Sequence, residues 1–281
     1  MESKVVYIHA DNEVVVYALN KERYSTDGFL VYPVDVIGYE YYTVSHSPTN
    51  SFSVFALASK FPDTRVSIAF PPQSAESHPI RVEYGGTTFT NGDVLNVTLA
   101  EFQAFQCLSY DQADLTGSHI TASLPVAVFS GNVRTWVGPQ TSRDHLAIQL
   151  PPVAAYGLKF PIIPTPKRTI GDVVRVVASQ PDTQLFVEGP PPRYYDMDSA
   201  GSYVDFEIPS NASSTVTADK PVLVVQIVQS QRSSDEKADP SMSVVTAITQ
   251  YMSDYVFSTP QYYNGGLYYF SHSSPLLINT K

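Results

Sequence analysis

A long internal repeat constrains the fold of this chain more than any other feature of its sequence. The segment from Pro33 to Pro71 matches the segment from Pro152 to Pro190 without a gap, at a shift of 119 residues. A constant shift preserves the face that each side chain takes in a strand, so we expect the two segments to form equivalent strands. The retained positions are Gly38 with Gly157, and Pro62, Asp63 and Thr64 with Pro181, Asp182 and Thr183.

A second block occurs three times. Ile8–Tyr17 matches Ile120–Phe129 at a shift of 112 residues, and Ile120–Phe129 matches Val216–Val225 at a shift of 96. Pro125 and Pro221 occupy the same place in the last two copies. The third copy ends before a Pro-Asp-Thr triplet, so it predicts a partial unit with an open sheet edge. Either the N-terminal strands or a C-terminal continuation is expected to cover that edge.

Short alternating strands fill most of the sequence. In Thr64–Phe70, apolar and polar side chains alternate, and Gly85-Gly86 joins two further runs as a hairpin turn. The 22 prolines and 14 glycines interrupt the chain at short intervals, and no window sustains an amphipathic helix. The sequence therefore predicts an all-β fold of tandem antiparallel β-sandwich-like repeat units, two full and one partial. The predicted units are residues 1–115, 116–212 and 213–281.

The retained residues suit turns. Gly38 and Gly157 fit a backbone position with positive φ. In the Pro-Asp-Thr triplets, proline presets φ, and the carboxylates of Asp63 and Asp182 are expected to accept a nearby backbone N–H as Asx-turns. These positions are interpreted as a structural signature and not as ligand sites.

Composition excludes several function classes. The net charge of −10 disfavours binding to nucleic acid or anionic lipid. Apolar runs such as Val14–Leu19 fall short of the ~20 residues of a membrane helix, so no membrane insertion is expected. The N-terminus lacks the apolar core of a signal peptide. Cys107 is the only cysteine and is expected to be buried as a small hydrophobe.

Motifs for catalysis or metal binding are weak. The six histidines show no metal-ligand spacing, and the sequence contains no Gly-x-Ser-x-Gly elbow and no phosphate-binding loop. Asp144-His145 resembles half of a catalytic triad, but a surface histidine is the favoured interpretation. We therefore expect no catalytic residues, no metal and no cofactor.

Paired tyrosines are the best binding candidates. Tyr194 and Tyr195 lie in a predicted Pro-rich loop, Gly189–Asp198, and Tyr262 and Tyr263 lie in a second predicted loop, Gln261–Leu267. Adjacent strand residues face opposite ways, so one ring of each pair is expected to reach solvent. The alternative is that the rings cover the junction between units. The sequons at Asn96 and Asn211 are candidate glycosylation sites.

An ordered set of motifs resembles a known family. The set comprises Gly28–Tyr42, Asp114–Gly117, Pro125–Gly131, Gln149–Gly157 and Lys220 to Met242. It resembles the IgGFc-binding protein N-terminal domain family over about residues 10–270. That resemblance implies secreted or cell-surface proteins, often mucus-associated or adhesive and multidomain, without enzymatic activity. Many relatives carry cysteines in the stretch that follows the segment equivalent to Pro125–Gly131, whereas residues 132–144 here contain none.

Three functions follow as hypotheses. The first is a non-catalytic extracellular module that binds a protein or glycan in cell adhesion and contacts other domains of a longer chain. The second is a structural spacer of an extracellular or mucus matrix. The third is a glycosidase that uses paired carboxylates, which would need two of them facing each other across a cleft.

Overall fold

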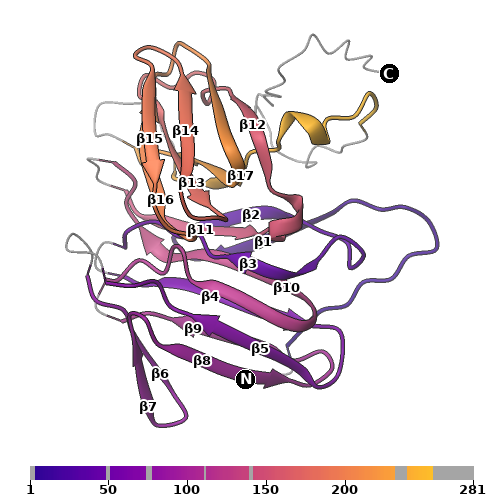
Figure 1. Ribbon diagram of the computed structural model, residues 1–281. Helices are drawn as coiled ribbons and strands as arrows, with labels where there is room; N and C mark the ends of the chain where they lie inside the picture. The colour runs from indigo at the N-terminus through magenta and orange to yellow at the C-terminus, as the bar shows by residue number, and fades with distance from the viewer. Residues whose placement is uncertain are drawn as a thin grey trace.

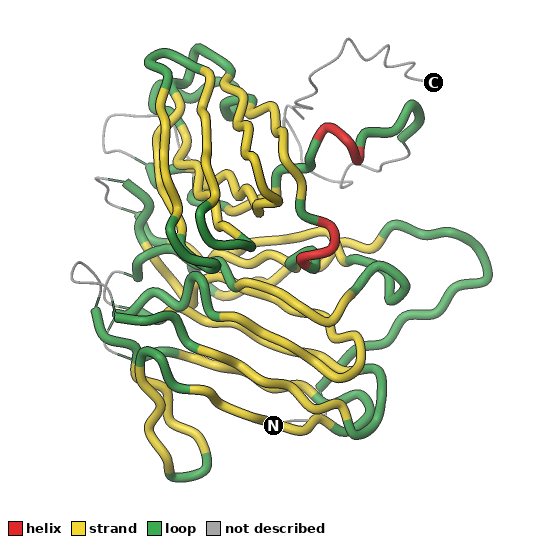
Figure 2. Tube along the Cα trace, viewed as in Figure 1, coloured by secondary structure: helices red, strands yellow, loops and turns green. Residues whose placement is uncertain are grey.

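The computed structural model describes residues 4–48, 51–73, 78–110, 112–138, 142–231 and 239–255. It consists of two antiparallel seven-stranded sheets, which we call unit 1 and unit 2, and two hairpins (Figure 1). Almost all regular structure is strand, as predicted, with only two short 3-10 turns, η1 (Val153–Ala155) and η2 (Ile248–Gln250), among the described residues (Figure 2). None of the described helices is long and apolar enough to cross a membrane.

Unit 1 contains β3 (Gly38–Tyr42), β4 (Ser53–Ser59), β5 (Thr64–Ala69), β8 (Val94–Leu99), β9 (Ala104–Leu108), β10 (His119–Thr135) and β11 (Asp144–Gln149). Unit 2 contains β12 (Gly157–Ile162), β13 (Asp172–Ala178), β14 (Thr183–Glu188), β15 (Arg193–Met197), β16 (Tyr203–Ile208), β17 (Ser214–Val228) and β18 (Met242–Val244). The hairpins are β1 (Val16–Glu22) with β2 (Ser25–Val31), and β6 (Arg81–Tyr84) with β7 (Thr87–Thr90).

The predicted repeat is confirmed strand by strand. The strands β3, β4 and β5 begin 119 residues before β12, β13 and β14. Asp63 and Asp182 both have left-handed backbone, with φ of 52° and 53°. The positive φ predicted for Gly38 and Gly157 is wrong. These glycines instead allow close packing, because an added Cβ would lie 2.5 Å from the Cβ of Pro152 and 2.3 Å from the Cβ of Ala247, respectively. The predicted Asx-turns are wrong, because the threonine closes each turn instead: the Oγ1 of Thr64 donates to the carbonyl of Phe61, and that of Thr183 to the carbonyl of Gln180.

One long strand in each unit turns a single sheet into two layers. In β10, residues 119–121 lie between β3 and β5, whereas residues 129–132 lie between β4 and β11. Pro125 lies at the change of partners, where the register shifts. β17 repeats this arrangement around Pro221. The segment before Pro221 lies between β12 and β14, and the segment after it lies between β13 and β18. Proline suits such a point because it has no N–H to offer to the ladder.

The sheets divide the chain differently from the predicted units 1–115, 116–212 and 213–281. β10 begins at His119 but pairs with strands of unit 1, and β17 likewise completes unit 2. Ile8–Tyr17 does not form a third long strand, since the described residues contain no strand before β1 begins at Val16. The β1–β2 hairpin lies beside β11 and not on the edge of a third unit.

The units share part of their core. The first hydrophobic core joins the interior of unit 1 to one face of unit 2, including Val173, Val177 and Val225. The second core, with Val174 and Val176, lies inside unit 2. Both faces of β13 are therefore buried. Cys107 is buried in the first core, as predicted, and burial raises the pKa of its thiol far above the ordinary value.

Candidate binding surfaces

An exposed aromatic pair marks the outer face of unit 2. Phe186 of β14 and Tyr194 of β15 lie directly opposite each other in the sheet, and their rings stack with centroids 4.6 Å apart and planes 27° from parallel. The side chain of Tyr194 is 78% exposed. Alternation along the strand explains this, because the residues on either side of Phe186 point into the second core.

Polar side chains surround the aromatic pair. Gln184 and Asp196 form the neighbouring cross-strand pair on the same face, and Thr217 of β17 lies beside Phe186. Both Gln184 and Asp196 are exposed. A planar aromatic surface with hydrogen-bonding groups at its rim is an arrangement that suits stacking against a sugar ring or an apolar contact of a protein partner.

The second tyrosine of this pair is structural. Tyr195 faces the interior of unit 2, where it packs against the second core and stacks on Phe206 with ring centroids 6.0 Å apart. The segment that holds both rings is the strand β15 and not the loop that the prolines predicted. Tyr262 and Tyr263, the other predicted pair, lie outside the described residues.

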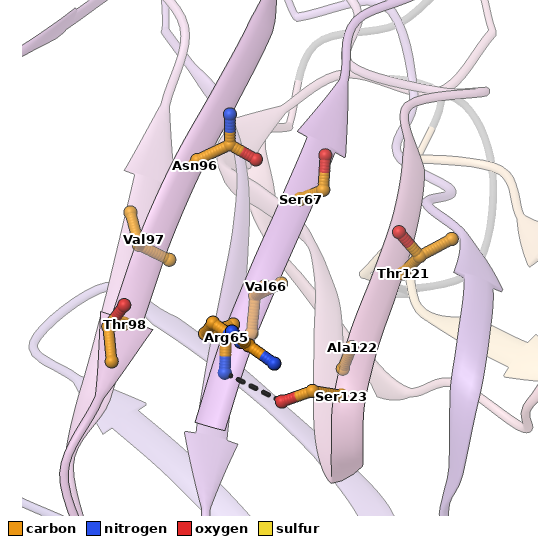
Figure 3. A pocket seen from close by; sticks show the side chains of 9 residues that line it. All are labelled: Arg65, Val66, Ser67, Asn96, Val97, Thr98, Thr121, Ala122 and Ser123. Carbon is orange, nitrogen blue, oxygen red and sulfur yellow. Dashed lines mark hydrogen bonds between the residues drawn. The ribbon is translucent and has the colours of Figure 1, made fainter. Parts of the chain in front are cut away.

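The equivalent face of unit 1 is a shallow hollow of about 370 Å³. Six of its nine lining residues are polar, and the lining comes from three adjacent strands, β5, β8 and β10 (Figure 3). Ser67 and Asn96 pair across the strands there as Phe186 and Tyr194 do in unit 2, and Thr121 corresponds to Thr217. The backbone N–H of Arg65 donates to the Oγ of Ser123 at 2.9 Å and closes one end of the hollow.

Both candidate glycosylation sites are exposed. Asn96 lies on the rim strand of the unit 1 hollow, and Asn211 lies in the turn between β16 and β17. A glycan on Asn96 would cover the hollow. Tyr194 takes the corresponding position in unit 2, so that face carries no sequon and stays uncovered.

Asp144 and His145 serve structural contacts. Asp144 accepts hydrogen bonds from the hydroxyl of Ser25 and the N–H of Thr26, while the ring of His145 contacts Asn20 and the carbonyl of Val133. The serine therefore contacts the carboxylate and not the imidazole, which is not the order of a nucleophile and its base. A second hollow of about 310 Å³ lies between the units, and neither hollow is lined by Asp or Glu.

The junction between the units contains a buried arginine that the sequence interpretation missed. Arg175 of β13 is 1% exposed. Its Nη1 lies 2.7 Å from Asp114 Oδ2 and 2.8 Å from Thr116 Oγ1 of unit 1, and Asp205 of unit 2 binds it through both oxygens at 2.7 Å. The ring of Tyr203 lies 4.1 Å from the guanidinium carbon.

Electrostatics favour ionisation of the junction carboxylate. Burial of Asp114 opposes its charge, but the guanidinium of Arg175 and hydrogen bonds from Ser45 and Thr116 hold its pKa well below the ordinary value. The adjacent Gly117 packs against Gly201 of unit 2, where an added Cβ would lie 2.2 Å from the Gly201 carbonyl oxygen. The Asp114–Gly117 motif therefore joins the units.

Comparisons with known proteins identify a family. A family model described as IgGFc binding protein matches residues 27–278. The human IgGFc-binding protein (Homo sapiens) is 27% identical over 253 residues, which cover 89% of this chain. The chain spans 4% of the length of that relative. No solved structure matches the chain.

Proposed function

Because this chain belongs to the IgGFc-binding protein family, we propose that it is a non-catalytic extracellular module that binds a protein or glycan. The outer face of unit 2, with Phe186 and Tyr194, is the binding surface. One observation carries this assignment: Tyr194 keeps 78% of its surface exposed while its ring is already held by stacking on Phe186. A ring fixed before binding loses little conformational entropy when a ligand covers it.

Two further observations support the proposal. The family relative is named for binding the Fc part of IgG, so a protein ligand is one of the two classes to test. The exposed sequons at Asn96 and Asn211 fit an extracellular glycoprotein. Asn96→Gln in a secreted expression system should remove one glycan, seen as a faster band on a denaturing gel.

The experiment compares two exposed tyrosines. Tyr194→Ala is tested with Tyr24→Ala as its matched control, because Tyr24 is 69% exposed but lies in the β1–β2 turn. Each variant is applied to a glycan array and to immobilised IgG Fc, and its Tm is measured. The proposal expects Tyr194→Ala to weaken binding at least about ten-fold without lowering Tm, since a hot-spot aromatic contributes about 2 kcal/mol or more. Unchanged binding by Tyr194→Ala would refute it.

A spacer role is the second candidate. The buried Arg175–Asp114 pair and the Gly117–Gly201 contact fix one unit on the other, as a rigid spacer in a matrix would require. It is favoured if the wild-type chain binds neither Fc nor any glycan but self-assembles in solution. A glycosidase is the least favoured function, because neither of the two hollows described above is lined by a carboxylate.

A further inference from the structure

The N-terminal hairpin has the register of a strand pair found in both units. Tyr17 of β1 lies opposite Leu30 of β2, as Phe129 lies opposite Gln149 in unit 1. The first positions differ by 112 residues and the second by 119, which are two of the three shifts of the sequence repeat. In unit 2, Val225 opposite Val244 continues the series. The hairpin therefore corresponds to β10–β11 and β17–β18.

One partner strand is absent from the hairpin. The second half of β10 has β11 on one edge and β4 on the other, and that of β17 has β18 and β13. Within the described residues, β1 pairs only with β2. Its second edge is the one that a β4-type strand occupies in both units.

One face of β1 is also uncovered. Tyr17 and Leu19 are 57% and 68% exposed, whereas Val225 and Ile227, their counterparts in unit 2, are completely buried. The opposite face of the hairpin is covered, because Phe29 packs on Phe129 of unit 1 with ring centroids 5.5 Å apart. An edge strand with large exposed apolar side chains is a ready template for another strand.

The turn indicates which backbone groups are open. Glu22 and Ser25 face each other across the two-residue turn Arg23-Tyr24, and such a pair closes a hairpin with its own hydrogen bonds. Bonded and non-bonded pairs then alternate along the ladder. The N–H and C=O groups of Tyr17, Leu19 and Lys21 consequently point away from β2.

We propose that the open edge of β1 binds an antiparallel strand of the β4 and β13 type, supplied by a second polypeptide that carries a repeat of this kind in which that strand is unpaired. The register follows from β13 on β17, where Arg175 lies opposite Val225 and Val173 opposite Ile227. The incoming strand places its Arg175 counterpart opposite Tyr17 and its Val173 counterpart opposite Leu19. Main-chain hydrogen bonds supply affinity, and the apolar pairs fix the register.

The binding test uses a synthetic peptide of residues 170–180, which contains the whole of β13. Binding to the full chain is measured by fluorescence anisotropy, with a scrambled peptide as reference. Leu19→Pro removes an outward N–H without touching the bonds to β2, so we expect it to weaken peptide binding at least about ten-fold. Leu19→Ala is the matched control and should weaken it less, because its backbone donor remains. Tm and circular dichroism confirm that both variants fold.

A cross-linking test checks the register. Leu19→Cys in the protein should form a disulfide with a peptide that carries Val173→Cys, because directly opposite residues share one face. A peptide with Val174→Cys points to the other face and should react at least about five-fold more slowly. Cys107 is buried and does not compete. No saturable binding, equal binding by Leu19→Pro, or equal rates for the two cysteine peptides would each overturn the proposal.

Discussion

Loss of the buried Arg175 should lower the free energy of unfolding, because this residue joins the two units. Arg175→Met removes the guanidinium but keeps an apolar chain of similar length, so Asp114 remains 6% exposed with no cation beside it. Breaking one partner of a buried ion pair costs about 3–5 kcal/mol, because the other charge stays buried without compensation. Asp205 keeps 37% of its side chain in solvent and should contribute little to this penalty.

The assay is urea and thermal unfolding followed by circular dichroism. For a chain of this size, the loss corresponds to a fall in Tm of roughly 10 °C. Adding Asp114→Asn to Arg175→Met should restore about 2 kcal/mol, since the unpaired charge is then removed. The matched control is Arg81→Met, because Arg81 bonds to Glu83 at 2.8 Å with both side chains half exposed. That variant should cost under about 1 kcal/mol. Equal losses for Arg175→Met and Arg81→Met would refute the reasoning.

Three further predictions concern pH, packing and reactivity. Burial raises the pKa of Asp27 from 3.8 to about 6, above its unfolded value, so the contribution of Asp27 to stability should increase by about 2 kcal/mol as pH falls from 7 to 4. In Asp27→Asn, the urea midpoint should no longer show this increase as pH falls. The same pH dependence in the variant and the wild type would show that Asp27 is not its cause. Gly117→Ala should cost about 3 kcal/mol or more in urea unfolding, because its Cβ meets the Gly201 carbonyl. Gly86→Ala, with similar positive φ but open space, should cost only about 1 kcal/mol, and equal costs would exclude the contact as the cause. Cys107 should react with a thiol reagent in urea but only slowly when folded, as its burial requires. Rapid native labelling would show that the core opens.

The strands were predictable because their information is local. The alternation in Thr64–Phe70 fixes which side chains share a face, and a gapless shift carries that assignment to the second copy. For this reason, β3, β4 and β5 each begin 119 residues before β12, β13 and β14. The prediction that one tyrosine of each pair reaches solvent follows from the same rule. In the described pair, adjacent positions on β15 place Tyr194 in solvent and Tyr195 inside unit 2.

The assignment of strands to sheets was not predictable from the sequence. The repeated block in β10 predicts that the second unit starts at residue 116. The hydrogen bonds of β10 with β4 instead make this strand part of unit 1. Phe186 was missed as a site residue for the same reason, because its position under Tyr194 depends on cross-strand pairing. The alternation of Gln184 to Glu188 was the available signal.

The sequence by itself determined the all-β class, the repeat and the face of each strand residue, because these depend on a period of two along the chain. Tertiary structure alone decided what lies against each face. Arg175 interrupts the apolar run Val173–Val177, and only the docking of unit 1 supplies the Asp114 that makes its burial favourable. Leu19 and Ile227 occupy equivalent strand positions, yet one is exposed and the other buried, because burial depends on the neighbouring sheet and not on the strand.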